Sequence, residues 1–169
     1  MIQEVLVIVA LPALLAAAAL WDLASYTIPN VLQIALVAGF AAFALAAGIS
    51  LDALSGHLAA GGIGLVVGFT LFAFGYIGGG DAKLFAGILL WLGLHDILAY
   101  TLVASIAGGA LTLALLSLRR LPLPAALATH SWVSRLHDQR SGVPYGAALA
   151  LGVFLILPQT EIFRLAAGG

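Results

Sequence analysis

The sequence contains no cysteine. This absence excludes disulfide bonds, thiolate nucleophiles and cysteine-based zinc sites together. Histidine is also scarce, and no two of the four histidines have the spacing of a helical metal site such as HExxH: they are His57, His95, His130 and His137. We therefore expect neither a metal nor any other cofactor.

Charged side chains are almost as rare, at 8% of the residues, whereas 63% are hydrophobic. A soluble domain with a polar shell cannot be built from this composition, so the sequence indicates a membrane protein. The net charge is −1, and no basic cluster is dense enough to bind a phosphate backbone. Nucleic acid is therefore excluded as a partner.

Long apolar runs fill most of the chain. A helix needs about 20 apolar residues to cross a bilayer, and five runs approach or exceed that length: 2–21, 31–49, 56–77, 97–118 and 143–160. The first run lacks a basic segment before it, so we expect a permanent span rather than a removable leader. A sixth run, 84–94, is too short to be assigned by length alone.

The positions of the basic residues decide whether the short run crosses the membrane, because Lys and Arg in short loops stay on the cytoplasmic side. Four of them lie between the last two long runs: Arg119, Arg120, Arg135 and Arg140. If 84–94 crosses, Lys83 lies on the same side as these arginines. The sequence thus predicts an all-α polytopic protein, a single domain over 1–169, with six transmembrane helices and both termini outside the cytoplasm.

Two aspartates are predicted to reach the same membrane surface. Asp22 ends the first run and Asp81 follows the third, and the 59 positions between them amount to one round trip across the membrane. Asp22 stands at the negative end of a helix dipole, where an anion is unfavourable, and an ionisable residue at the edge of a span indicates function. The alternatives are a helix cap for Asp81 and an interfacial role beside Trp21 for Asp22.

As a pair, the aspartates suggest hydrolysis. Two carboxyl groups brought close together share a proton, so that one acts as a base toward water and the other as an acid toward a carbonyl oxygen. We therefore interpret Asp22 and Asp81 as candidate catalytic residues of an aspartic protease, a chemistry that needs no cofactor.

The residues around Asp81 are expected to support that site. Gly78, Gly79 and Gly80 carry no side chains and permit positive φ, so an extended substrate backbone could approach Asp81 closely. Lys83 is expected to orient or tune Asp81, or else to be a positive-inside anchor.

Three stretches resemble the type IV prepilin peptidases, the GxGD membrane aspartic proteases, in the short single-domain form found with tight-adherence pilus systems. "GGGDAKLF" at 78–85 resembles the GxGDxK signature, and "DLASYTIPN" at 22–30 resembles the second aspartate motif, with Pro29 and Asn30 at its end. "GVPYGAAL" at 142–149 is similar to the final motif, and contains Pro144 and Tyr145. The resemblance implies that Asp22 and Asp81 are the catalytic pair.

The resemblance also implies a function. Members of this family cut the basic leader from prepilins or pseudopilins at the cytoplasmic face of the bacterial inner membrane, so such a substrate and membrane lipid are the expected partners. The chain lacks the cysteine-rich insertion and the length that accompany N-methylation, and no methyltransferase activity is expected. A membrane transporter and a non-catalytic pilus-assembly protein are the alternatives that the residues leave open.

Overall fold

The computed structural model describes residues 1–167, and within them every regular element is helical. The all-α prediction is therefore confirmed for these residues. The longer helices are α2 (Leu11–Ser25), α3 (Asn30–Ala47), α4 (Leu51–Ala73), α5 (Gly79–Leu118) and α8 (Tyr145–Ile156). The short ones are α1 (Ile2–Glu4), α6 (Ala125–Ala128), α7 (Ser131–His137) and α9 (Glu161–Ala167).

The first helix is continuous from Ile2 to Ser25, because a π-helical segment, Val5–Ala10, joins α1 to α2. It ends at Tyr26, whose backbone is left-handed with φ 56°. Pro29 then precedes the first residue of α3, where its fixed φ of −58° suits a helix start. The chain is thereby turned back along the bundle within a few residues.

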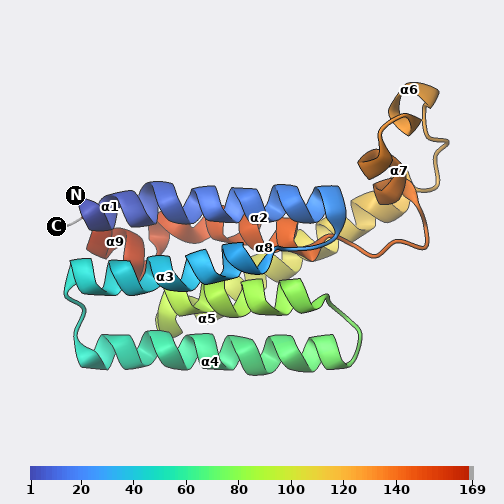
Figure 1. Cartoon of the computed structure of the whole chain (residues 1–169). Helices are drawn as coiled ribbons and strands as arrows, with labels where there is room; N and C mark the ends of the chain where they lie inside the picture. Colours follow the sequence, from blue (N-terminus) through green and yellow to red (C-terminus); the bar gives the residue numbers. More distant parts are fainter. Residues whose placement is uncertain (168–169) are drawn as a thin grey trace.

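Helix α4 lies at the edge of the bundle and packs mainly on α5 (Figure 1). Two glycines make this close packing possible. A methyl group added at Gly64 would lie 2.9 Å from Ala86 Cα, and one added at Gly68 would lie 2.9 Å from the Ala82 carbonyl oxygen. Small residues at such a seam let helices approach where water cannot drive their association.

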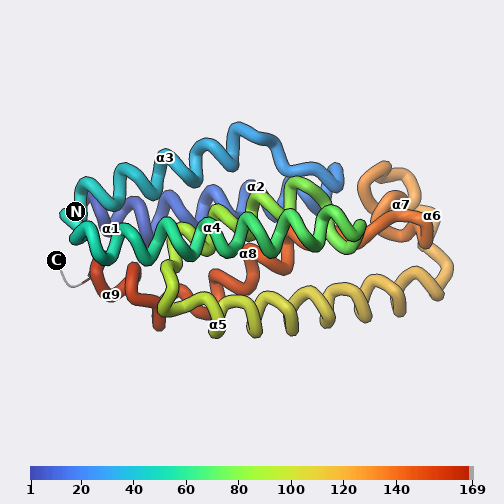
Figure 2. The backbone as a smooth tube through the Cα atoms, turned by 90° about the horizontal axis from the view of Figure 1, so that it is seen from below, coloured from blue at the N-terminus to red at the C-terminus, as the bar shows by residue number. Residues whose placement is uncertain are grey.

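The backbone of α5 is broken at Gly93, where φ is 74° and ψ is 178°. The chain reverses direction there, so the two halves of α5 run in opposite directions along the bundle (Figures 1 and 2). The apolar runs 84–94 and 97–118 place a reversal between them, at the polar pair His95 and Asp96. The structure has the reversal at Gly93, because only glycine readily adopts this backbone conformation.

Four helices are long and apolar enough to cross a membrane: Ile2–Ser25, Asn30–Ala47, Leu51–Ala73 and Gly79–Leu118. A fifth span exists if Tyr145–Gln159 and Glu161–Ala167, which are bent by 53°, cross as one unit. The six-span count and the side of the termini stay predictions.

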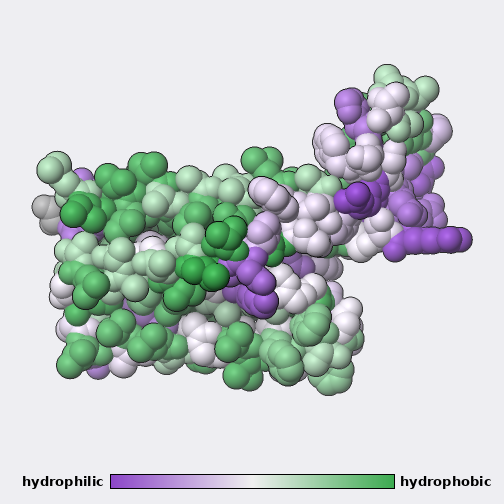
Figure 3. Space-filling model, in the orientation of Figure 1, coloured by the Kyte–Doolittle hydropathy of each residue, from purple (hydrophilic) through white to green (hydrophobic). Residues whose placement is uncertain are grey.

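The surface of the bundle suits lipid. Hydrophobic side chains cover most of its visible face, which has one hydrophilic patch near the middle, and further hydrophilic side chains gather around α6 and α7 (Figure 3). Outward-facing leucines such as Leu45 and Leu98 are each 84% exposed. The N-terminus and α9 lie at the end of the bundle opposite to α6 and α7 (Figure 1), so the molecule has one hydrophilic end beyond an apolar body.

Candidate functional site

Asp22 lies in the last turn of α2 and is only 3% exposed. Its Oδ2 accepts a hydrogen bond of 2.8 Å from the backbone N–H of Gly146, at the start of α8. A buried carboxyl group is costly unless it is hydrogen-bonded, and this bond meets part of that need. The first turn of α8 therefore fixes the position of the Asp22 carboxyl group at the end of α2.

Asp81 lies in the first turn of α5 and is 7% exposed. Its Oδ2 accepts a hydrogen bond of 3.1 Å from the Gly78 N–H. The capping role that the sequence allowed is thus present. It does not exclude a second role, because the same carboxyl group lines a cavity.

Both aspartates line one cavity of about 370 Å³, here called the aspartate cavity. Most of its lining comes from the segments that connect helices or begin them. The lining residues are Asp22, Tyr26, Thr27, Ile28, Asn30, Gly78, Gly79, Gly80, Asp81 and Lys83. The structure thus brings seven of the residues singled out in the sequence to one place. Pro29 lies between two lining residues in the chain. Pro144 and Tyr145 are not in the lining, and Tyr145 instead lines a separate groove that also includes Asp81.

The three glycines before Asp81 act through their missing side chains. None of them uses the positive φ that glycine permits, since the positive-φ glycines among the described residues are Gly48, Gly75 and Gly93. A methyl group added at Gly80 would lie 3.3 Å from Ile28 Cβ, so a side chain there would press on the segment that follows Asp22. Close packing of this backbone explains the glycine.

Lys83 and Asn30 connect two sides of the aspartate cavity. Lys83 Nζ donates to Asn30 Oδ1 at 3.0 Å, and beside them Gln33 Nε2 donates to the Gly80 carbonyl oxygen at 3.2 Å. These two bonds hold the start of α3 against the first turn of α5. A role of Lys83 in tuning Asp81 stays a prediction.

Gly146 is a site residue that the sequence reasoning did not single out. A methyl group added there would lie 2.9 Å from Asp22 Oδ2 and 2.8 Å from Ile28 Cδ1, so the position has no room for a side chain. It follows Pro144 and Tyr145 in the chain, and Pro144 stands directly before α8 and its first N–H groups.

Arg119 is a second residue that sequence reasoning missed, since it was counted only as one of the cytoplasmic basic residues. It is 6% exposed, at the end of α5. Its guanidinium group donates to three backbone carbonyl oxygens of the following loop, those of Leu136 (2.8 Å), Ser141 (3.0 Å) and Gly142 (2.8 Å). Arg119 thereby closes the loop 119–142 on itself just before α8.

The same guanidinium group reaches the aspartate cavity. Arg119 Nη2 donates to Tyr26 Oη at 3.5 Å, and Tyr26 lines the cavity. Burial raises the pKa of Tyr26, and the Arg119 guanidinium offsets part of that rise. Tyr26 therefore stays a neutral hydroxyl group at physiological pH.

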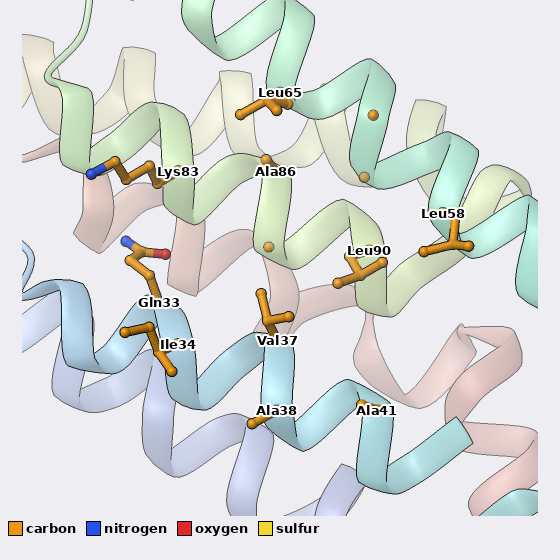
Figure 4. A pocket seen from close by; sticks show the side chains of 13 residues that line it. Gln33, Ile34, Val37, Ala38, Ala41, Leu58, Leu65, Lys83, Ala86 and Leu90 are labelled. Atoms are coloured by element: carbon orange, nitrogen blue, oxygen red, sulfur yellow. The ribbon is translucent and has the colours of Figure 1, made fainter. Parts of the chain in front are cut away.

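Two lateral grooves adjoin the aspartate cavity, and each shares one residue with it. The Asp81 groove, of about 590 Å³, lies among α4, the second half of α5 and α8, with Asp81 in its lining. The Lys83 groove, of about 660 Å³, lies among α3, α4 and the first half of α5 and includes Lys83 (Figure 4).

This arrangement offers acid and base groups without a metal centre. Among residues 1–167, no group of three or more His, Asp or Glu side chains is placed to hold a metal ion. Two carboxyl groups facing one cavity can activate a water molecule and protonate a leaving group between them. Acid–base chemistry is therefore available to these side chains.

Comparison with known proteins gives an independent result. No curated protein and no solved structure matches the chain. The sequence profile of the type IV leader peptidase family matches residues 9–113, a stretch that includes both Asp22 and Asp81 and more than half of the chain. The chain therefore belongs to the type IV leader peptidase family.

Proposed function

We propose that the chain is a membrane aspartic endopeptidase that removes the basic leader from prepilins or pseudopilins. One observation carries the proposal: in a member of the leader peptidase family, two aspartates 59 positions apart line one cavity at the end of the helix bundle. A carboxyl pair in this setting can supply both the acid and the base that peptide hydrolysis needs, without a cofactor.

In the proposed mechanism, Asp22 and Asp81 share one proton. The ionised carboxylate takes a proton from a water molecule as this water attacks the scissile carbonyl carbon. The protonated carboxyl group hydrogen-bonds the carbonyl oxygen and later passes its proton to the departing amine. The Gly146 N–H on Asp22 and the Gly78 N–H on Asp81 hold the two groups in place during these steps.

The proposed setting is the bacterial inner membrane, with residues 1–169 as a single domain and the aspartate cavity facing the cytoplasm. The reversal at Gly93 supports six crossings, because it lets the two halves of α5 cross separately. The basic loop 119–142 lies at the same end as the aspartate cavity, through Arg119 and Tyr26. Arginines in such a loop favour the cytoplasmic side, and both termini then lie outside.

The test is leader removal from a co-expressed prepilin, followed as a shift on a gel. We expect Asp22→Asn and Asp81→Asn to lower the processing rate by about 10²–10⁴-fold, the usual contribution of a general acid or base. Asp138→Asn is the matched control, because this exposed aspartate lies in the loop 119–142 and should leave processing unchanged.

Normal processing by either dyad variant would remove that aspartate from the mechanism. Absence of processing by the wild-type chain, inserted normally and supplied with its own prepilin, would favour a transporter or a non-catalytic assembly protein instead.

A further inference from the structure

The Asp81 groove opens toward lipid along the side of the bundle. Leu113 on one wall is 68% exposed and Val67 on the opposite wall is 42% exposed, so its mouth faces outward. The groove is bounded by α4 and α8 as well as α5, and Asp81 is its one acidic lining residue. An apolar groove of this kind is filled in a membrane by lipid or by another helix.

Four small residues from the second half of α5 line the groove and are here called its floor: Ala104, Ser105, Gly108 and Gly109. A methyl group added at Gly109 would meet no atom within 4 Å, so the space above it is open. Small residues in a row let a second helix approach closely, and this close packing is what drives helix association in lipid. The floor therefore favours a helix as the occupant.

Asp81 belongs to both the groove and the aspartate cavity. The cavity is lined by helix ends and connecting segments, with polar side chains such as Thr27 and Asn30, while the groove is lined mainly by apolar ones. A leader-bearing substrate has the same two parts, a polar leader and a hydrophobic helix, joined at the scissile bond. Asp81 is the one lining residue that the polar cavity and the apolar groove have in common.

Charge distinguishes the Asp81 groove from the Lys83 groove. The N-terminal end of a helix carries a partial positive charge, which a carboxylate stabilises and an ammonium group destabilises. In Figure 4 the Lys83 groove ends at the Lys83 side chain, beside Gln33, so it presents the unfavourable charge at that position.

We propose that the hydrophobic helix of the substrate docks in the Asp81 groove, with its N-terminal end at Asp81 and its leader in the aspartate cavity. This inference rests on the proposed peptidase function. The substrate then enters sideways from the membrane, between α4 and the second half of α5.

Two glycine substitutions test the groove. Gly109→Leu fills the Asp81 groove and Gly62→Leu fills the Lys83 groove, and at both positions a side chain meets no atom within 4 Å of its Cβ. Initial rates of leader removal are measured with purified enzyme and a purified prepilin in lipid nanodiscs. We expect Gly109→Leu to slow processing at least tenfold, mainly through KM, and Gly62→Leu to behave as wild type with the same thermal stability.

The outcomes separate the two proposals. Wild-type processing by Gly109→Leu, or equal impairment of both variants, overturns the groove assignment and leaves the peptidase function intact. No processing by the wild-type enzyme overturns the function itself.

Disulfide trapping gives a second readout that does not depend on the rate. The chain has no cysteine of its own, so Ser105→Cys in the groove and Ala110→Cys, exposed on another face of the same helix, are each the only thiol. They are combined with Asp22→Asn, which keeps the prepilin uncleaved, and with single cysteines in the first three turns of the prepilin helix. Copper-phenanthroline oxidation should join the prepilin to Ser105→Cys and not to Ala110→Cys. Joining to Ala110→Cys alone, or to neither, contradicts the docking.

Discussion

Asp22 is held by a backbone group rather than by another side chain. The Gly146 N–H donates to its Oδ2 at 2.8 Å, and the glycine leaves no space between α8 and the carboxyl group. The position of this carboxyl group is therefore set by the backbone of a residue in α8 that lies 124 positions later in the chain.

Gly146→Ala is expected to displace the Asp22 carboxyl group, because the added methyl group would lie 2.9 Å from Oδ2. A misplacement of about 1 Å in a catalytic group costs roughly 10²-fold in rate. Leader processing should fall by that order, as measured by initial rates. Gly142→Ala is the matched control, since its methyl group would meet no atom within 4 Å. A wild-type rate for Gly146→Ala would mean that this contact does not set the reaction geometry.

Arg119→Gln is expected to release the loop 119–142. Each hydrogen bond to a charged group contributes about 1.5–3 kcal/mol, and the buried guanidinium group makes three such bonds to loop carbonyl oxygens. Limited chymotrypsin digestion should cut the loop faster, and processing should slow because the loop leads into α8. Arg119→Lys should restore little of the protection against digestion, because an ammonium group lacks the planar arrangement of donors with which a guanidinium group binds several carbonyl oxygens at once.

The exposed neighbour provides the comparison for this substitution. Arg120→Gln should digest and process as the wild-type chain does. Equal loop protection in Arg119→Gln and Arg120→Gln would show that the buried bonds do not hold the loop.

Much of the residue-scale arrangement was predictable. The spacing of Asp22 and Asp81, together with span counting, predicts that both reach one end of the bundle, and both line the aspartate cavity. Gly146 and Arg119 were not predictable in the same way, because their roles depend on which carbonyl or N–H faces them. Hydropathy and charge position do not contain that information.

At the scale of elements, α5 depends on Gly93. Its φ of 74° and ψ of 178° lie in a region that is essentially restricted to glycine. His57 of α4 packs directly against it: a methyl group on Gly93 would lie 3.1 Å from the ring Cε1, and the ring Nδ1 is 3.0 Å from the Leu90 carbonyl oxygen. The sequence predicted that two apolar runs meet here, but the residue that reverses the chain is decided by this local conformation.

Gly93→Ala should lower the thermal stability of the protein in detergent more than Gly48→Ala does. Both positions have positive φ, but Gly48 is in the ordinary left-handed region and its methyl group would meet no atom within 4 Å. The strain at Gly93 is of order 1–3 kcal/mol, with the His57 contact in addition. Adding His57→Ala to Gly93→Ala should recover only the part of the lost stability that comes from the contact between the new methyl group and the His57 ring. Equal melting temperatures for the two single variants would contradict the assignment of strain to Gly93.

The molecule is an apolar bundle with one hydrophilic end, and its N-terminus and α9 lie at the other end. The number of crossings depends on whether the two halves of α5 cross separately. If they do, the reversal at Gly93 and the loop 119–142 lie on opposite sides of the membrane.

Single cysteines test this topology, with a membrane-impermeant maleimide added to intact spheroplasts. The exposed positions Ser50 and His95 should react as Ser50→Cys and His95→Cys, and Ser131→Cys in the loop should react only after permeabilisation. Protection of His95→Cys together with labelling of Ser50→Cys would show that the first half of α5 does not cross.

The Arg119 guanidinium group binds main-chain oxygens, so it recognises the path of the loop and not the identity of its side chains. The loop can therefore accumulate substitutions during evolution at little cost. Insertions or deletions between Arg119 and Gly142 would instead move the accepting carbonyl oxygens away from the guanidinium group. Natural variants of this protein should accordingly differ in loop composition more freely than in loop length.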